Sequence, residues 1–122
     1  KLQMPEKLEI SKDIITTLLR LKSLFLITRK ALKTLGNCAG VPIEPPEQTS
    51  LCNSTMKLPG VLSCSVPGAG GHDAIVAIAL GNNALMRIED HWLNMKDKGG
   101  NNVCMMPLKA GIMYDGLLAK WK

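Results

Sequence analysis

The feature that most constrains the fold is a glycine-rich turn at residues 66–73, with the sequence Val-Pro-Gly-Ala-Gly-Gly-His-Asp. Apolar runs lie on both sides of it, at residues 60–65 and 74–80. Short apolar runs bounded by turn residues are typical of strands. The sequence therefore predicts a strand at 61–66, a rigid turn, and a second, buried strand at 74–80.

The same turn is a candidate anion site, because glycine has no Cβ and lets the backbone approach a ligand. Consecutive N–H groups in such a turn form a concavity that suits phosphate. The candidate phosphate- or substrate-binding residues are Gly68, Ala69, Gly70, Gly71, His72 and Asp73. Most glycine-rich turns between strands bind nothing, so a structural turn is the alternative on spacing alone. Asp73 fits two roles equally: binding magnesium or a substrate hydroxyl, or holding the turn.

Two nucleotide-binding motifs do not match the turn. A Walker-type loop ends in Gly-Lys-Ser/Thr, which is missing here. Asp73 stands where a dinucleotide fingerprint has its third glycine, which argues against a Rossmann fold. No set of side chains with metal-ligand spacing is found, so no metal site is predicted.

A long amphipathic helix is expected before the turn, starting with Ser11 as its cap and ending near Gly36 or Gly40. Its apolar stripe, at steps of three and four with Thr28 as the one polar gap, consists of Ile14, Leu18, Leu21, Phe25, Leu32 and Leu35. We expect residues 1–10, with Pro5, to form an irregular leading segment. The basic residues of the predicted helix are Arg20, Lys22, Arg29, Lys30 and Lys33. They exclude a membrane span and are interpreted as a solvated face.

The remaining elements follow from prolines and periodicity. Three prolines make residues 41–46 an extended connector. Helices are predicted at 47–56 and 84–95, and an edge strand at 103–108, where Pro107 cannot donate to a ladder. Residues 111–122 form a tail. The fold class is α+β, one domain over residues 1–122 with a small, mostly antiparallel sheet covered by helices.

Composition limits the partners. The chain has 122 residues and a net charge of +5, which favours anionic ligands. Aromatic residues make up 3%, too few for a platform that stacks nucleic-acid bases. The four cysteines form no Cys-x-x-Cys pair, so we expect reduced, mostly buried thiols in a cytoplasmic-type compartment. The chain begins with Lys1, which we interpret as a sign of processing or of a longer parent.

Several segments together resemble a known family. They are residues 39–45, Gln48-Thr49, Thr55-Met56, 60–62, 66–71 and Asp73-Ala74. This pattern resembles the C-terminal domain of the eukaryotic phosphomevalonate kinases, which belong to the GHMP kinase superfamily. The resemblance is dense over residues 39–81 and implies an incomplete ferredoxin-like domain of a longer enzyme.

The resemblance implies a cytoplasmic transferase, with a peroxisome-type organelle as the alternative. It would move the γ-phosphoryl group of ATP onto 5-phosphomevalonate, with Mg²⁺, to give 5-diphosphomevalonate for isoprenoid and sterol biosynthesis. In this superfamily the glycine turn is the third motif. Its counterparts here, Gly68 to Gly71, are expected to donate backbone N–H groups to phosphate. A branched side chain at Gly70 would then fill the space meant for phosphate.

The departures from the family limit what this chain does alone. The first motif and the serine-rich ATP loop are missing, so catalytic residues are expected in an N-terminal GHMP domain of the same parent chain. His72 stands where the family pattern has an aromatic residue. We expect no turnover from the fragment. The alternatives are a non-catalytic ferredoxin-like module that binds a small anion or regulates, and a basic amphipathic helix at a membrane surface.

Overall fold

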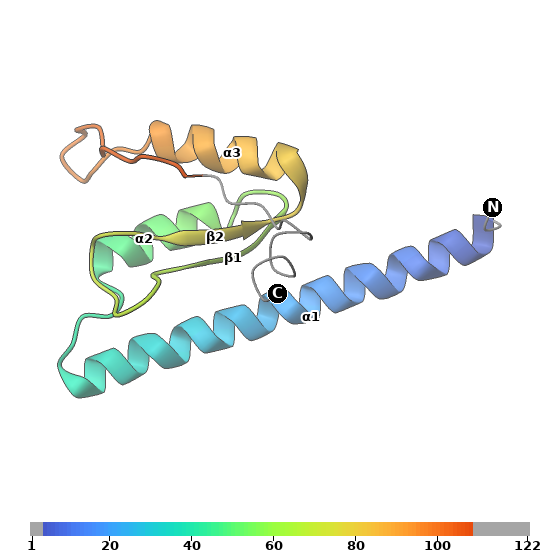
Figure 1. Ribbon diagram of the computed structural model, residues 1–122, viewed down its shortest axis with the longest axis horizontal. Helices are drawn as coiled ribbons and strands as arrows, with labels where there is room; N and C mark the ends of the chain where they lie inside the picture. The colour runs from blue at the N-terminus through green and yellow to red at the C-terminus, as the bar shows by residue number, and fades with distance from the viewer. Residues whose placement is uncertain (1–3, 109–122) are drawn as a thin grey trace, which may run out of the picture. The chain divides into compact units, whose positions relative to one another are not determined.

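The computed structural model describes residues 4–108, with side chains from residue 11 onward. In chain order the elements are α1 (Met4–Ala39), α2 (Pro46–Thr55), β1 (Val61–Ser65), β2 (Val76–Ala79) and α3 (Gly81–Leu93) (Figure 1). This confirms the predicted α+β class. The chain divides into two compact units, Lys1–Ile88 and Glu89–Lys122, and each is described by itself.

Helix α1 is longer than predicted. It begins at Met4 rather than Ser11, so the expected irregular leading segment is wrong from residue 4 onward. Pro5 lies in the first turn, where the missing N–H would have no helical partner anyway. The C-terminus is a Schellman motif, with Gly40 at φ 68°, Val41 N–H bonded to Gly36 O at 2.9 Å, and Gly40 N–H to Asn37 O at 3.3 Å. Of the two predicted ends, Gly36 and Gly40, the structure confirms the second.

The face that α1 turns toward the rest of its unit differs from the predicted stripe. Its less exposed residues, at steps of three and four, are Leu18, Lys22, Phe25, Arg29, Lys33 and Gly36. Of the predicted apolar stripe only Leu18 and Phe25 lie on this face; Ile14, Leu21, Leu32 and Leu35 are exposed. The interpretation of the basic group as a solvated face is wrong for three of its five members. Cations take these inner positions because acceptors from α2, β1 and the connector meet them there.

Helix α2 follows the connector as predicted. Pro46 occupies the first helical position and Glu47 lies in the first turn, where a carboxylate is favourable. Its buried residues are Gln48, Leu51, Cys52 and Thr55. With these residues α2 packs against β1.

The sheet is an antiparallel pair, β1 with β2, in the register Val61↔Ala79, Ser63↔Ile78 and Ser65↔Val76, with an irregularity between Val61 and Ser63. β1 matches its prediction; it contacts α1, α2 and β2 and is buried along most of its length. β2 is shorter than the predicted strand and is not buried, since Val76 is 47% and Ile78 44% exposed. Among the described residues β2 pairs only with β1, so part of its apolar surface has no cover.

Helix α3 starts at Gly81, earlier than predicted, and buries Ala84 and Ile88. A Cβ added to Gly60 would lie 2.7 Å from that of Ala84, so a glycine is needed before β1. In the second unit the predicted strand at 103–108 is wrong: the described residues there form no strand, and the pairing nearby is an isolated bridge between Lys96 and Asn102. The hydrogen bond from Val103 N–H to Met95 O, at 2.9 Å, belongs to this bridge and is not continued into a ladder within the described residues. The predicted tail lies outside the described residues.

Candidate functional site

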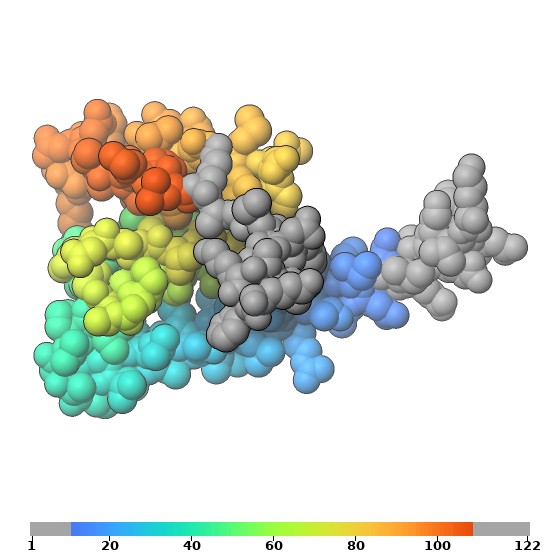
Figure 2. All heavy atoms as spheres, in the orientation of Figure 1, coloured from blue at the N-terminus to red at the C-terminus, as the bar shows by residue number. Residues whose placement is uncertain are grey.

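The glycine turn lies at the surface, between β1 and β2 (Figure 2, yellow-green). Gly68, Ala69, His72 and Asp73 are exposed, and Gly70 and Gly71 are half-buried. The three glycines have φ values of 63°, 88° and 104°, which L side chains rarely adopt. The sequence of the turn is therefore required by its backbone path.

The amides of residues 68–71 divide into two pairs, and those of His72 and Asp73 have no acceptor within the described residues. Gly70 N–H donates to Pro67 O at 3.3 Å, and Gly71 N–H donates to Ile43 O at 3.1 Å. No acceptor for the N–H of Gly68 or Ala69 lies within the described part of the chain. An anion at the tip of this turn would thus meet the amides of Gly68 and Ala69, whereas those of Gly70 and Gly71 are used inside the chain.

Steric space separates Gly70 from the other two glycines of the turn. A Cβ at Gly70 would lie 2.5 Å from Ile43 O, inside the contact distance of that backbone. At Gly68 and Gly71 nothing lies within 4 Å of an added Cβ. The expectation that the space beside Gly70 is kept for phosphate is therefore wrong, because the connector fills it.

His72 and Asp73 flank the turn on its C-terminal side. His72 Nε2 lies 3.5 Å from Glu47 Oε2, in the first turn of α2, and both side chains are well exposed. Protonation of His72 would make this contact an ion pair. Asp73 is exposed as well. The two side chains stand beside the exposed amides, and their roles stay predictions.

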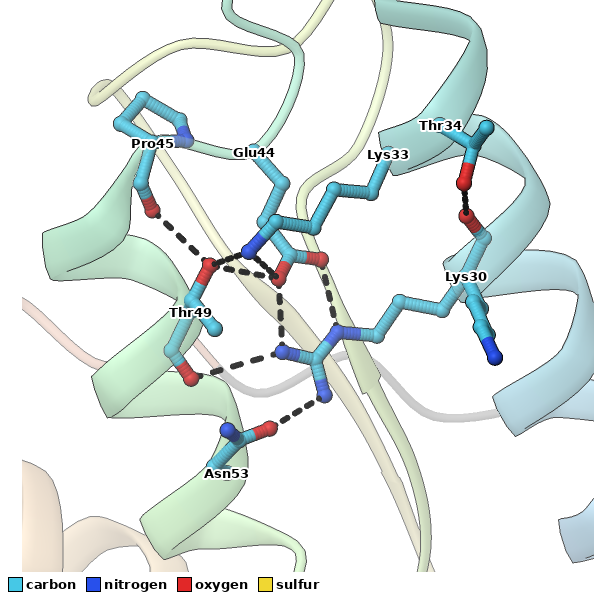
Figure 3. Close-up of polar contacts among 8 residues, drawn as sticks. Lys30, Lys33, Thr34, Glu44, Pro45, Thr49 and Asn53 are labelled. Atoms are coloured by element: carbon cyan, nitrogen blue, oxygen red, sulfur yellow. Dashed lines mark hydrogen bonds and ion pairs between the residues drawn. The ribbon is translucent and has the colours of Figure 1, made fainter. Parts of the chain in front are cut away.

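A second polar cluster holds the connector. We call it the Glu44 clamp: Arg29 and Lys33 of α1, Glu44 of the connector, and Thr49 and Asn53 of α2 (Figure 3). Arg29 binds Glu44 through two parallel hydrogen bonds, Nε to Oε2 at 2.7 Å and Nη2 to Oε1 at 2.8 Å. Bidentate pairing of this kind is the strongest and most directional form of an ion pair.

The other members of the clamp complete the shell of Glu44. Thr49 Oγ1 donates to Glu44 Oε1 at 2.8 Å and accepts from Lys33 Nζ at 2.5 Å. Lys33 Nζ is also 3.7 Å from Glu44 Oε1. Arg29 Nη1 donates to Asn53 Oδ1 at 3.0 Å. No buried side-chain nitrogen or oxygen lacks a partner in the described residues.

Electrostatics in the clamp favour the charged forms. Burial by itself raises the pKa of Glu44, but the hydrogen bonds from Arg29 and Thr49 and the charges of Arg29 and Lys33 outweigh it. The pKa of Glu44 is therefore below its usual value. The hydrogen bond to Glu44 raises the pKa of Arg29 against the opposing effect of burial. The pair stays ionised at neutral pH.

Sequence reasoning missed the clamp. The available signal was the spacing of Lys22, Arg29 and Lys33, which shares the helical face of Leu18 and Phe25. Lys22 confirms this rule, since its Nζ donates to Val61 O at 3.0 Å and is 3.5 Å from Met56 O, just after α2. Basic residues that recur at steps of three and four on the same helical face as apolar residues can therefore indicate the face that packs against the rest of the protein.

The thiols are split evenly. Cys52 and Cys64 are 0% and 1% exposed, whereas Cys38 and Cys104 are exposed, and all four are free. The expectation of mostly buried thiols holds for only two. A hydrogen bond with Cys52, together with burial, raises the pKa of Cys64, so Cys64 keeps its proton as a core residue.

The described residues show neither a metal-ligand cluster nor a helix that could span a membrane. They contain no group of three or more His, Cys, Asp or Glu side chains that could hold a metal ion. None of their helices has the length and apolar character needed to cross a membrane.

Comparison with known proteins finds similarity to one group. A phosphomevalonate kinase of Arabidopsis thaliana, named as peroxisomal, is 49% identical over 74 residues, covering 61% of this chain and 15% of the relative. A phosphomevalonate kinase of Candida albicans is 46% identical over 54 residues, or 44% of this chain and 12% of the relative. A phosphomevalonate kinase of Aspergillus fumigatus is 42% identical over 55 residues, which cover 45% of this chain and 11% of the relative.

These matches confirm the resemblance to the phosphomevalonate kinases that the sequence motifs indicated. The chain spans about an eighth of the length of the curated relatives that it matches. No family model matches the chain. No solved structure matches it either.

Proposed function

Because this chain carries a segment related to the phosphomevalonate kinases, we propose that it is part of such a kinase. The parent would transfer the γ-phosphoryl group of ATP to 5-phosphomevalonate, giving 5-diphosphomevalonate for isoprenoid biosynthesis. The observation that carries this proposal is the identity of 40–49% to four curated phosphomevalonate kinases.

The contribution of this chain would be to position a phosphate. Phosphoryl transfer needs little covalent chemistry from the protein and depends on placing charged groups and stabilising them electrostatically. The exposed N–H groups of Gly68 and Ala69 are the donors that the turn offers. In this proposal they bind phosphate oxygens, and His72 contacts the same phosphate. Asp73 would orient a substrate hydroxyl or brace the turn.

ATP and Mg²⁺ would be held mainly by residues outside this chain. The described residues contain no group of three or more side chains that could hold a metal ion, which supports a magnesium site made mainly by the rest of the parent protein. The catalytic residues are likewise proposed to lie in an N-terminal GHMP domain of the same parent. By itself this chain would show no turnover.

Exposed apolar surface supports a missing partner domain. On α1, Ile14, Leu24 and Leu35 are 53%, 52% and 60% exposed, and β2 exposes Val76 and Ile78. Concentrations of exposed apolar side chains usually mark surfaces that another body covers. We propose that the rest of the kinase covers them. For the compartment we propose a peroxisome or the cytoplasm, the former supported by the name of the Arabidopsis relative.

The test uses the intact polypeptide that contains this chain. Phosphoryl transfer from ATP is measured with 5-phosphomevalonate and, as a control acceptor, with mevalonate. We expect turnover with the first alone, and thermal stabilisation by both ATP–magnesium and 5-phosphomevalonate. Stabilisation by phosphate alone, without turnover, would favour the non-catalytic anion-binding module. No response to any of these compounds would contradict the proposal.

A further inference from the structure

The glycine turn and the Glu44 clamp are joined by one peptide unit. The carbonyl of Ile43 that accepts the Gly71 N–H belongs to the peptide bond between Ile43 and Glu44. That bond is planar and rigid, so the direction of the carbonyl follows the position of the Glu44 backbone. A movement of the Glu44 backbone therefore also moves the Ile43 carbonyl oxygen that accepts the Gly71 N–H.

Glu44 itself has little freedom. Its side chain is 4% exposed and receives hydrogen bonds from Arg29 and Thr49, with Lys33 nearby. The donors come from α1 and α2, so the clamp fixes the connector to both helices.

The turn depends on the connector in a second way. Gly70 packs so closely on the Ile43 backbone that a Cβ would not fit. Gly70 and Gly71 thus rest on the connector, through contact and through a hydrogen bond. Gly68 and Ala69, just before them, are exposed, and nothing lies within 4 Å of a Cβ added to Gly68.

We propose that Arg29 and Glu44 are positioning residues for the anion-binding turn: their ion pair sets the Ile43–Glu44 peptide, which orients Gly70 and Gly71 and so presents the amides of Gly68 and Ala69. The anion is the phosphate group of the substrate, and this part rests on the proposed function. A pair that served stability alone has a weaker rationale, because buried ion pairs contribute little net stability against apolar replacements.

The first test measures amide hydrogen exchange without ligand, in the intact polypeptide, for peptides covering residues 66–73 and β1. Glu44→Gln keeps the shape and removes the charge. We expect the amides of Gly70 and Gly71 to exchange roughly tenfold faster, with β1 changed by less than about threefold. Asp13→Asn, an exposed carboxylate on α1, is the matched control and should change neither. Unchanged exchange at the turn, or equal acceleration in β1, would overturn the proposal.

A second pair of variants separates geometry from charge. Arg29→Lys keeps the positive charge but loses the two-pronged fit, so it should reproduce part of the Glu44→Gln effect. Arg20→Lys, on the exposed face of the same helix, should have none. If Glu44→Gln does not fold, Thr49→Val removes one donor to Glu44 and serves in its place. Equal results for the two lysine variants would overturn the assignment to Arg29.

Titration with 5-phosphomevalonate then tests the functional half. Glu44→Gln should raise its Kd by roughly tenfold at the intact polypeptide, by misplacing the turn. Faster exchange with an unchanged Kd would overturn the positioning role. A wild-type protein that does not bind 5-phosphomevalonate would instead contradict the proposed function, while the exchange result still decides whether the clamp orders the turn.

Discussion

The glycine turn and the Glu44 clamp differ in the groups that form them and in how those groups are satisfied. The turn is made from backbone and leaves exposed amides, those of Gly68 and Ala69 among them, without an acceptor in the described chain. The clamp is made from side chains and leaves no buried polar atom without a partner. Groups that are satisfied within the fold hold it together, and groups that are not are available for a ligand. The difference supports our proposal that the turn binds an anion and that the clamp holds the turn in place.

The same distinction separates residues inside the turn. Gly68 and Gly70 both have positive φ, but an added Cβ meets open space at the first and the Ile43 backbone at the second. Gly70 therefore packs the turn against the connector, and Gly68 lies at its exposed tip.

The largest effect is expected at Glu44. Glu44→Ala leaves the Arg29 guanidinium buried against the domain without its counter-charge, which should lower the free energy of unfolding by about 3 kcal/mol. Glu47→Ala, three residues on and exposed, should change it by less than about 0.5 kcal/mol. Urea unfolding of the two variants checks this. Equal losses would mean that the clamp contributes no more than a surface contact.

The next effect is expected at Gly70. Gly70→Ala forces a Cβ into the backbone of Ile43 and should cost about 2 kcal/mol of stability. Gly68→Ala pays only for its left-handed backbone, about 1 kcal/mol. The expected order for binding is the opposite: Gly68→Ala should raise the Kd for 5-phosphomevalonate more than Gly70→Ala does, because it places a methyl group at the exposed tip of the turn. Thermal melts and 5-phosphomevalonate titrations of both variants decide. Equal melting losses would contradict the assigned difference.

A smaller effect separates the thiols. Cys52→Ala removes a fully buried sulfur next to Cys64 and should destabilise by about 1 kcal/mol. Cys38→Ala, at an exposed position on α1, should be neutral within about 0.5 kcal/mol. In the native protein a thiol reagent should modify Cys38 and Cys104 quickly and the buried pair only on unfolding. Rapid modification of all four would show that the core around β1 opens easily.

The smallest effect is on the acid side of the stability profile. The pKa of Glu44 is lower in the folded state than in the unfolded state, so the unfolded chain binds protons first as the pH falls. The stability that Glu44 contributes is complete above the pKa that it has in the unfolded chain, about 4.3. It is lost as the pH falls through the lower pKa that Glu44 has in the folded protein. The wild-type protein should therefore lose stability below that range more steeply than Glu44→Gln. Parallel acid profiles would contradict the assigned charge state.

Sequence reasoning succeeded where the signal was local. Glycines and prolines set the Schellman stop at Gly40, the start of α2 at Pro46 and the turn before β2. The apolar run of β1 was correctly assigned as a strand, and the family resemblance was found from motifs alone. These features depend on residues close in the chain, which a single sequence displays.

What failed depended on distant partners. The inner face of α1 carries Lys22, Arg29 and Lys33 because their acceptors lie on α2, β1 and the connector, far along the chain. Burial of β2 was overestimated because an apolar run does not reveal how many neighbours a strand has. The occupant of the space beside Gly70, Ile43, could not be inferred from spacing within the turn.

The most direct test of the account follows the backbone amide signals of the turn during titration of the intact polypeptide with 5-phosphomevalonate, using glycine- and alanine-selective ¹⁵N labelling. We expect saturable shifts at Gly68 and Ala69, with smaller ones at Gly70 and Gly71, whose N–H groups keep their hydrogen bonds inside the chain. Saturation of the protein with unmoved signals at Gly68 and Ala69 would contradict the account.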